Sequence, residues 1–162
     1  MGTVTGSVGR HNVAEATLRL SPLTPADYVD HFTLTTPVAA TGTPEQWARA
    51  MFGDTPGPLG TLIFRGLLQL RIASAPSPGT VGGWRIADRG PDWIRLEAES
   101  WALRGNLVVQ AGQGQVSLAT FQRYHRRAGA LVWTALSAVH RRLAPGLLRA
   151  AAATVEAQHV RR

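Results

Sequence analysis

Residues 128–157 read AGALVWTALSAVHRRLAPGLLRAAAATVEA, and this stretch decides the fold. On a helical wheel of about 100° per residue, its apolar side chains fall in one stripe, which is typical of a helix that packs on a core. The stripe consists of Gly129, Val132, Trp133, Leu136, Val139, His140, Leu143 and Leu147. Arginines such as Arg142 and Arg149 fall outside it. The stretch therefore predicts one long amphipathic helix.

Pro145 is predicted to lie on the far, wet side of this helix. A proline there removes one hydrogen bond and bends the helix toward the surface on which it packs. The alternative is that Pro145 splits the stretch into two helices, 128–143 and 145–158. The sequence leaves both options open.

The sequence before this helix predicts an antiparallel meander of four strands, at 83–88, 93–101, 104–111 and 115–125. In the second strand, Ile94 and Leu96 alternate with Arg95, Glu97 and Glu99. This alternation predicts a sheet with one face on the core and one face in water.

The register of the last strand stays open. If Val116 and Leu118 face the core, then Thr120, Gln122 and Tyr124 also do. Ala119 and Phe121 favour the opposite register.

Ahead of the meander, the alternation in 28–35 predicts a first strand, and two helices follow. Thr43, Pro44 and Gln46 form a capping-box start for a helix over 44–53, and leucines at helical spacing predict a second helix over 58–72. We therefore expect three parts. They are a flexible arm over 1–22 with one strand at its end, a single domain over 23–158, and a basic tail over 159–162.

Composition narrows the class of protein. The 162 residues carry a net charge of +7, all of it contributed by Arg123–Arg162, which holds eight arginines and one acid. Because there is no cysteine, disulfides and thiolate chemistry are excluded. The N-terminus lacks the pattern of a signal peptide, and arginines interrupt the apolar run at 59–72, so we expect a cytoplasmic protein without membrane contact.

The fold class is therefore predicted as α+β. A curved antiparallel sheet wraps around a long C-terminal helix, with two short helices between the first and second core strands. This order, over residues 26–158, resembles the START-like (SRPBCC, helix-grip) superfamily, which includes polyketide cyclases and lipid carriers. Four runs also look like an actinobacterial branch of it whose members have no assigned reaction. They are GWRI at 83–86, RLEAESW at 95–101, ATFQRY at 119–124 and HRRLAPGLL at 140–148.

The resemblance implies a ligand cavity between the sheet and the long helix. His140 is the first candidate for catalysis, because it lies in the apolar stripe and its pKa suits acid–base work near neutrality. The alternative is a core histidine with one hydrogen bond to the sheet. Tyr124 is the second candidate, as a donor that orients a carbonyl, or else as an anchor of the strand end.

Seven further residues are predicted to line the cavity and bind a ligand. They are Trp84, Ser100, Trp101, Thr120, Gln122, Trp133 and Leu136. Core packing is the competing interpretation for the tryptophans. Glu97 and Glu99 share a strand face with Arg95, so a solvated charged face is favoured over a catalytic pair of carboxylates.

No metal site is expected, because the histidines lack i, i+4 spacing and there is no Asp-rich loop. No nucleotide fingerprint occurs. The arginines are not interleaved with exposed aromatic residues, so nucleic-acid binding is not expected either.

The first functional hypothesis is a cofactor-free cyclase or isomerase of biosynthesis, acting on a polyketide-like apolar molecule that the cavity folds into a reactive shape. The second is a non-catalytic carrier or sensor of a hydrophobic small molecule. The oligomeric state stays open, with a homodimer as one option.

Overall fold

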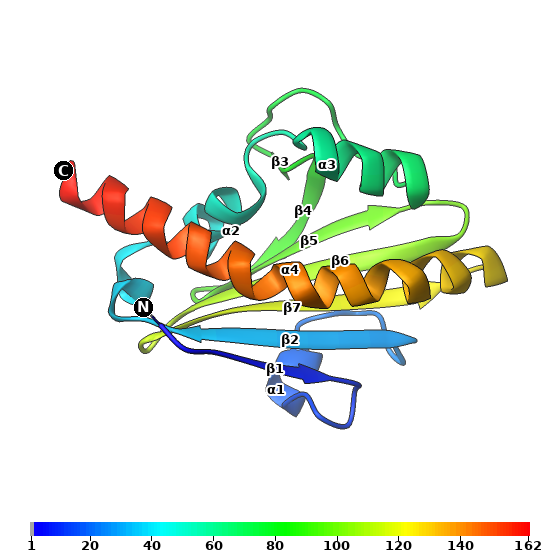
Figure 1. Cartoon of the computed structure of the whole chain (residues 1–162), viewed down its shortest axis with the longest axis horizontal. Coiled ribbons are helices and arrows are strands. Elements are labelled where there is room, and N and C mark those ends of the chain that lie inside the picture. Colours follow the sequence, from blue (N-terminus) through cyan, green and yellow to red (C-terminus); the bar gives the residue numbers. More distant parts are fainter. Residues whose placement is uncertain (1) are drawn as a thin grey trace.

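The computed structural model describes residues 2–162 and contains one seven-stranded antiparallel sheet, with the strand order β1-β2-β7-β6-β5-β4-β3. A long helix, α4, lies across one face of the sheet (Figure 1). This face is called the inner face here, and the opposite one the outer face. The strands are β1 (Val4–Val8), β2 (Tyr28–Thr35), β3 (Thr80–Val81), β4 (Trp84–Arg89), β5 (Trp93–Glu99), β6 (Leu103–Gly112) and β7 (Gln115–Tyr124). The α+β fold predicted from the sequence is confirmed.

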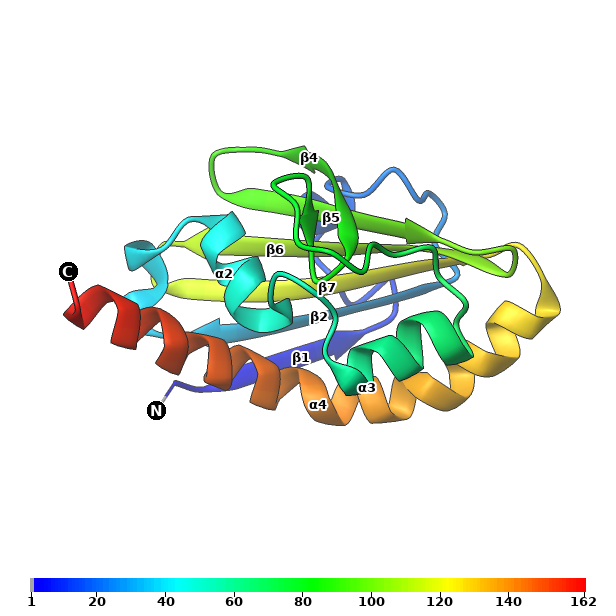
Figure 2. The ribbon, with the colours of Figure 1, turned by 90° about the horizontal axis from the view of Figure 1, so that it is seen from above.

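Helix α4 (Arg127–Val160) is one continuous helix, so Pro145 does not split it. Figure 2 shows the helix curved, with its concave side toward the sheet. Pro145 itself is half-buried, so the prediction that it lies on the wet side of the helix is wrong.

The predicted apolar stripe of α4 is wrong in part. Val139 and Leu143 are 47% and 49% exposed, whereas the buried line runs through Trp133, Ala144 and Leu148. Beyond Pro145 it continues through Ala151 and Val155. Small side chains in this line let the helix lie close to the sheet, and a wheel weighted toward large side chains overlooks them.

Short helices lie between β2 and β3. They are η1 (Pro37–Thr41), α2 (Pro44–Phe52), α3 (Pro58–Thr61) and the π-helical turn η2 (Leu62–Leu67). The capping box of α2 is confirmed, because the Thr43 hydroxyl accepts from the Gln46 amide and the Gln46 side chain accepts from the Thr43 amide. The helix predicted over 58–72 ends early. Gln69 adopts a φ of 53°, and Leu70 and Ile72 then alternate as buried residues of an extended segment.

The main core lies between the inner face and the helices. Its largest fully buried members include Trp47, Trp84, Leu96 and Leu118. The open register of β7 is now settled. Val116 and Leu118 belong to this core, whereas Ala119 and Phe121 face the other way.

The outer face is only partly wet, which corrects the prediction. A second cluster of buried residues covers part of it, consisting of Val13, Leu23, Val29, Val108, Ala119 and Phe121. Val13 comes from residues 1–22, which were predicted to form a flexible arm, and Leu23 directly follows them. The same stretch supplies the edge strand β1 and the short helix α1 (Glu15–Leu18). The strand therefore comes at the beginning of the arm and not at its end.

Glu97 was predicted to face water, but it is only 8% exposed. Arg85 and Arg104 each donate to Glu97 Oε1, at 2.7 and 2.8 Å. The buried Asn106 donates to Glu97 Oε2 and accepts from Ser21 of the arm, at 3.2 and 2.7 Å. Burial raises the pKa of Glu97, but these partners outweigh it and hold the pKa below the ordinary value. Glu97 is thus part of a structural network that ties the arm to the sheet.

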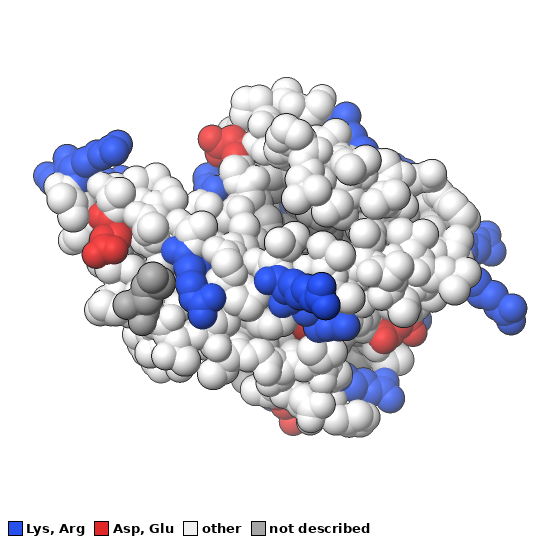
Figure 3. Space-filling view, viewed as in Figure 1, with Lys and Arg blue, Asp and Glu red and all other residues white. Residues whose placement is uncertain are grey.

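Arginines on the face shown in Figure 3 form several separate groups, with acidic side chains between some of them. Within residues 2–162, no helix is long and apolar enough to span a bilayer.

Candidate functional site

The side chain of His140 lies against two neighbouring strands. Its Nε2 is 2.9 Å from Asp30 Oδ2 on β2 and 3.2 Å from Thr120 Oγ1 on β7. Asp30 and Thr120 are register partners in adjacent strands, so one turn of α4 reaches both. Because an ionised carboxylate only accepts hydrogen bonds, Nε2 carries a proton that it donates to Asp30.

Burial differs sharply between the two members of this pair. The Asp30 side chain is 0% exposed, whereas the His140 side chain is 21% exposed. A buried carboxylate requires hydrogen-bond partners, since an unpaired buried charge is strongly destabilising. The imidazole is therefore held from its buried side and open to solvent on the other.

Tyr28 is the second donor to Asp30. Its hydroxyl donates to Oδ2 at 2.5 Å and lies 3.5 Å from Arg141 Nη1, which donates to it. Burial raises the pKa of Tyr28 well above 10.0, and the charge of Asp30 raises it further, while Arg141 acts in the opposite direction. Tyr28 thus stays protonated and keeps donating. The set Arg141, Tyr28, Asp30, His140 and Thr120 is called the Asp30 network below.

Trp133 forms the aromatic wall of the Asp30 network. Its ring centroid is 5.3 Å from that of Tyr28, edge to face, and 5.4 Å from that of His140. Such aromatic packing fixes ring orientation as well as burying area. The wall therefore holds the two donors of Asp30 in place.

Several buried polar atoms on the inner face have no partner among the described residues. They are Asp30 Oδ1, Gln122 Oε1, Trp84 Nε1 and Trp133 Nε1. Gln122 is the register partner of Tyr28, so it lies next to the Asp30 network. Buried polar atoms are normally paired, and groups of exceptions point to a functional role.

Of the predicted site residues, His140 and Thr120 belong to the Asp30 network, and Gln122 and Trp133 lie beside it. Leu136 is half-buried against the main core, and Trp84 is buried there and packs edge to face on Phe64. Asp30 and Tyr28 were not predicted as functional residues from the sequence. The available signal was an acid in phase with Phe32 and Leu34, which indicates a buried carboxylate in need of donors.

Tyr124 does face the inner side of the sheet, where it is half-buried against the main core. It lies four residues along β7 from Thr120, a distance of about 13 Å. Burial and, to a lesser degree, Asp27 raise its pKa. Among the described residues, no hydrogen bond links the Tyr124 hydroxyl to His140. The tyrosine beside the Asp30–His140 pair is Tyr28, where Tyr124 was predicted.

Ser100 and Trp101 lie away from the Asp30 network, in the turn between β5 and β6. The Ser100 hydroxyl accepts from the amides of Ala102 and Leu103, at 3.1 and 3.2 Å, which stabilises the turn. Trp101 is 54% exposed and donates to Gln69 at 2.6 Å. The structure thus gives both residues local roles.

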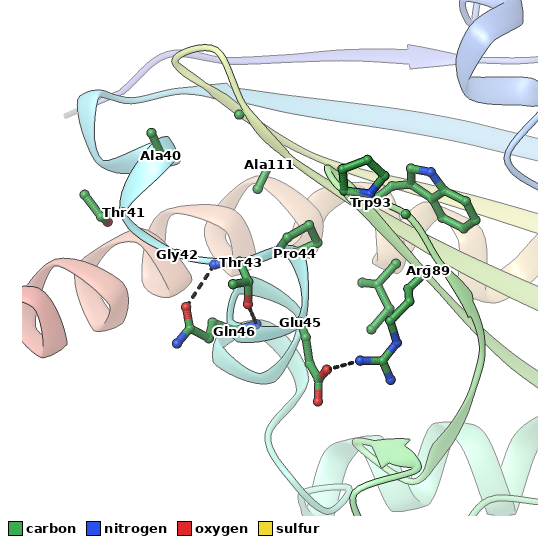
Figure 4. Close-up of a pocket in the computed structure, with 14 residues that line it drawn as sticks. Ala40, Thr41, Gly42, Thr43, Pro44, Glu45, Gln46, Arg89, Trp93 and Ala111 are labelled. Carbon is green, nitrogen blue, oxygen red and sulfur yellow. Dashed lines mark hydrogen bonds and ion pairs between the residues drawn. The ribbon is translucent and has the colours of Figure 1, made fainter.

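Three cavities are found outside the Asp30 network. One, of about 600 Å³, lies between the start of α2 and the β4–β5 turn, where the ion pair of Glu45 and Arg89 borders it at 2.6 Å (Figure 4). A second, about 340 Å³, is on the outer face, and a third, about 130 Å³, lies beside Trp101 and Gly129. None of the three is lined by His140. The third is lined by Leu103 of β6 and by Ala128, Gly129 and Val132 of α4, so it lies between the sheet and the start of the long helix, away from the Asp30 network.

The described residues contain no group of three or more histidine, aspartate or glutamate side chains that could hold a metal ion. At the Asp30 network, an imidazole that a buried carboxylate orients can take part in proton transfer.

No family model matches the chain, and no curated protein matches it. Among solved structures, the crystal structure of CalU16 from Micromonospora echinospora covers 96% of this chain and 95% of its own, at 12% sequence identity and a TM-score of 0.29. A TM-score of this size does not establish a common fold. The assignment of a function therefore rests on the geometry of the Asp30 network.

Proposed function

We propose that the protein is a cofactor-free acid–base enzyme, a cyclase or isomerase that uses the Asp30–His140 pair. The observation that carries the proposal is the 2.9 Å contact between a fully buried carboxylate and a partly exposed imidazole. A carboxylate on one ring nitrogen fixes the tautomer and the orientation of a histidine and stabilises its protonated form. His140 Nδ1 is then the nitrogen that serves a substrate.

The reaction follows from what one such histidine can do. Nδ1 removes a proton from a carbon next to a substrate carbonyl, and the electron pair of the C–H bond forms an enolate. Returning the proton to another carbon completes an isomerisation. In a cyclisation, the enolate carbon attacks a second carbonyl of the same molecule, and the new alkoxide takes the proton from His140.

The substrate class is proposed from the resemblance to the START-like (SRPBCC, helix-grip) superfamily and from the aromatic surroundings of the pair. Polyketide-like molecules carry carbonyls whose neighbouring C–H bonds are acidic, so a single imidazole suffices as base. Trp133, against His140, would hold the apolar part of such a molecule. Substrate would approach from the exposed side of His140.

Proton exchange tests this without knowledge of the natural substrate. A panel of 1,3-diketones in D₂O would be followed by NMR for protein-catalysed exchange of the hydrogens between the carbonyls. We expect His140→Gln and Asp30→Asn to lower the rate by about 10²–10⁴-fold, the usual contribution of a positioned acid or base.

The control is His125→Gln, because His125 also contacts a carboxylate, that of Glu99 at 3.0 Å, but lies at the end of β7 outside the Asp30 network. The His125→Gln variant should catalyse the exchange at the rate of the wild type. Equal rates for His140→Gln and wild type would remove His140 from any mechanism.

A second candidate function is a carrier or sensor of a hydrophobic small molecule. The observation in its favour is the group of unpaired buried polar atoms at Gln122, Trp84 and Trp133, which a ligand admitted between sheet and helix would pair. Native mass spectrometry of freshly purified protein should then find a bound molecule that is returned unchanged. Gln122→Leu should lose it, and His140→Gln should retain it. Turnover of that molecule by the wild type would show that the protein is an enzyme and not a carrier or sensor.

A further inference from the structure

The outer face carries a cavity of about 340 Å³ that is separate from the Asp30 network. Its floor comes from three neighbouring strands, because Thr33 of β2, Ser117 of β7 and Gln110 of β6 are successive register partners across the sheet. Thr17 of α1 adds a wall, and His31 lies on the same floor. The cavity therefore lies on three hydrogen-bonded strands of the sheet.

Its hydroxyl groups are arranged as hydrogen-bond acceptors. Thr17 Oγ1 and Ser117 Oγ both donate to the same atom, Gln110 Oε1, at 3.2 and 3.5 Å. With its proton used in this way, each hydroxyl oxygen can only accept a further bond. Thr17 and Ser117 are also buried, so they are not ordinary side chains of a wet sheet face.

His31 adds a further unsatisfied group. Its Nε2 is buried and has no hydrogen-bond partner among residues 2–162. Burial lowers the pKa of His31, and the charge of Asp30 opposes this less strongly, so the imidazole is neutral near pH 7. A neutral imidazole nitrogen without a proton is an acceptor. The neutral ring has one such nitrogen, so His31 can accept a hydrogen bond from a ligand that lies beside Thr17 and Ser117.

The charges of the lining residues also favour a ligand that donates hydrogen bonds. The chain has a net charge of +7, yet no arginine is among the ten residues that line this cavity. The ionisable groups of the lining are the neutral His31 and the carboxylate of Asp92, which is exposed on its rim. An anion would find no counter-charge here, whereas O–H and N–H donors would find acceptors.

We propose that this cavity is a second binding site, for a small molecule of monosaccharide size that is rich in O–H or N–H donors. The volume lies at the lower end of the range of ligand pockets, which suits such a molecule. Hydroxyls or amines would donate to Thr17, Ser117 and His31, and an amine would also pair with Asp92. The site lies on the opposite face from the Asp30 network and does not depend on the function proposed there.

The test uses the full chain with ¹⁵N-labelled histidine, whose five imidazoles are resolved by NMR and assigned with His31→Gln. Glucose, putrescine and glucosamine are titrated in the millimolar range, and citrate serves as an anionic control. We expect a saturable shift of the His31 ring with glucosamine. If glucose binds and putrescine does not, hydroxyls are the recognised donors. If putrescine binds and glucose does not, the amine is the recognised donor.

Two variants locate the site. Ser117→Ala, read from the His31 ring, and His31→Gln, read by calorimetric titration because it lacks that ring, should each weaken binding by about three- to tenfold, the usual effect of losing one hydrogen bond. His11→Gln, at an exposed position, should bind like the wild type. The proposal is overturned if none of the three donor-bearing probes shifts His31, if citrate shifts it equally, or if Ser117→Ala binds unchanged.

Discussion

Asp30 shows at the scale of one residue how a buried charge organises a site. The carboxylate lies in a strand whose inner neighbours Phe32 and Leu34 are apolar, so it loses its hydration on folding. The hydroxyl of Tyr28 and the imidazole of His140 replace that hydration on Oδ2. Removing either donor would leave the buried charge less compensated, and this ties the stability of the site to its chemistry.

Tyr28 gives the first prediction, which concerns alkaline pH. Because its pKa is raised on folding, the folded state keeps the phenol proton when the unfolded chain has lost it above pH 10.0. The resulting stability is complete below pH 10.0 and is lost as the pH rises toward the folded-state pKa. Tyr28→Phe should lower the free energy of unfolding by about 1–3 kcal/mol at pH 7 and flatten its decline above pH 10.0.

Urea unfolding followed by circular dichroism, at about pH 8 and about pH 11, measures both effects. Tyr124→Phe is the matched comparison, because burial also raises the pKa of Tyr124 but no hydrogen bond to Asp30 strengthens the effect, so this variant should flatten the alkaline decline less than Tyr28→Phe does. If Tyr28→Phe retained the full alkaline decline, Tyr28 would not be the group responsible.

The candidate site could be predicted only in part from the sequence, and the reason is geometric. His140 was found because a helical wheel needs no knowledge of other elements. Asp30 and Tyr28 were missed as partners because their meeting with His140 depends on how far along the sheet α4 lies. Periodicity within one element does not contain that distance. Tyr124 was chosen over Tyr28 for the same reason.

At the scale of elements, the docking of α4 depends on one glycine near its start. A Cβ atom at Gly129 would clash with the carbonyl oxygen of Ala102 and lie 3.3 Å from Leu103 Cβ. At Gly146, on the exposed side of the same helix, a Cβ would meet nothing within 4 Å. The two positions therefore separate packing from helix propensity.

Gly129→Ala and Gly146→Ala form the second prediction. Gly146→Ala should raise stability by up to about 1 kcal/mol, because alanine favours the helix and restricts the unfolded chain. Gly129→Ala should lower it by about 1–3 kcal/mol despite the same propensity gain, because the helix start must move off the β5–β6 turn. Urea denaturation of both variants checks this. Stabilisation by Gly129→Ala would show that α4 does not pack on this turn.

Elements were predicted well where the pattern was local, and poorly where tertiary contacts decided. The bounds of β2 and the cap of α2 follow from alternation and from Thr43-Pro44-Glu45-Gln46, and the structure has them as predicted. The end of the second helix and the edge strand β1 were not foreseen. The stretch at 68–72 has a spacing that suits helix and strand alike, and β1 forms by pairing with β2, which its own sequence does not signal.

At the scale of the whole molecule, the sheet is packed on both faces. α4 and the short helices cover the inner face, and residues from the first 27 positions cover part of the outer face (Figure 2). The arm is fixed by Val13, which packs in the outer cluster with Leu23, by the pairing of β1 with β2, and by the bond of Ser21 to Asn106. We therefore expect residues 1–22 to belong to the folding unit.

Deletion of residues 1–22 is the third prediction. It would expose Val29, Val108 and Phe121 to water, leave Asn106 without Ser21, and free the edge of β2. An exposed apolar sheet face with a free edge favours aggregation. The truncated protein should bind a hydrophobic dye, self-associate on size-exclusion chromatography, and melt about 10 °C or more below the full chain.

The control is deletion of residues 159–162 at the other end. The last residues of α4 are exposed, and Arg161 and Arg162 lie beyond the helix, so their loss should leave the melting temperature within about 2 °C of the full chain. Calorimetry and chromatography of the two truncated proteins under one set of conditions give the comparison. A chain without residues 1–22 that stayed monomeric and melted like the full protein would show that the arm is an appendage. The outer-face cavity would then lose Thr17 without any loss of the fold, and its binding of donor-rich probes could be measured on the sheet residues alone.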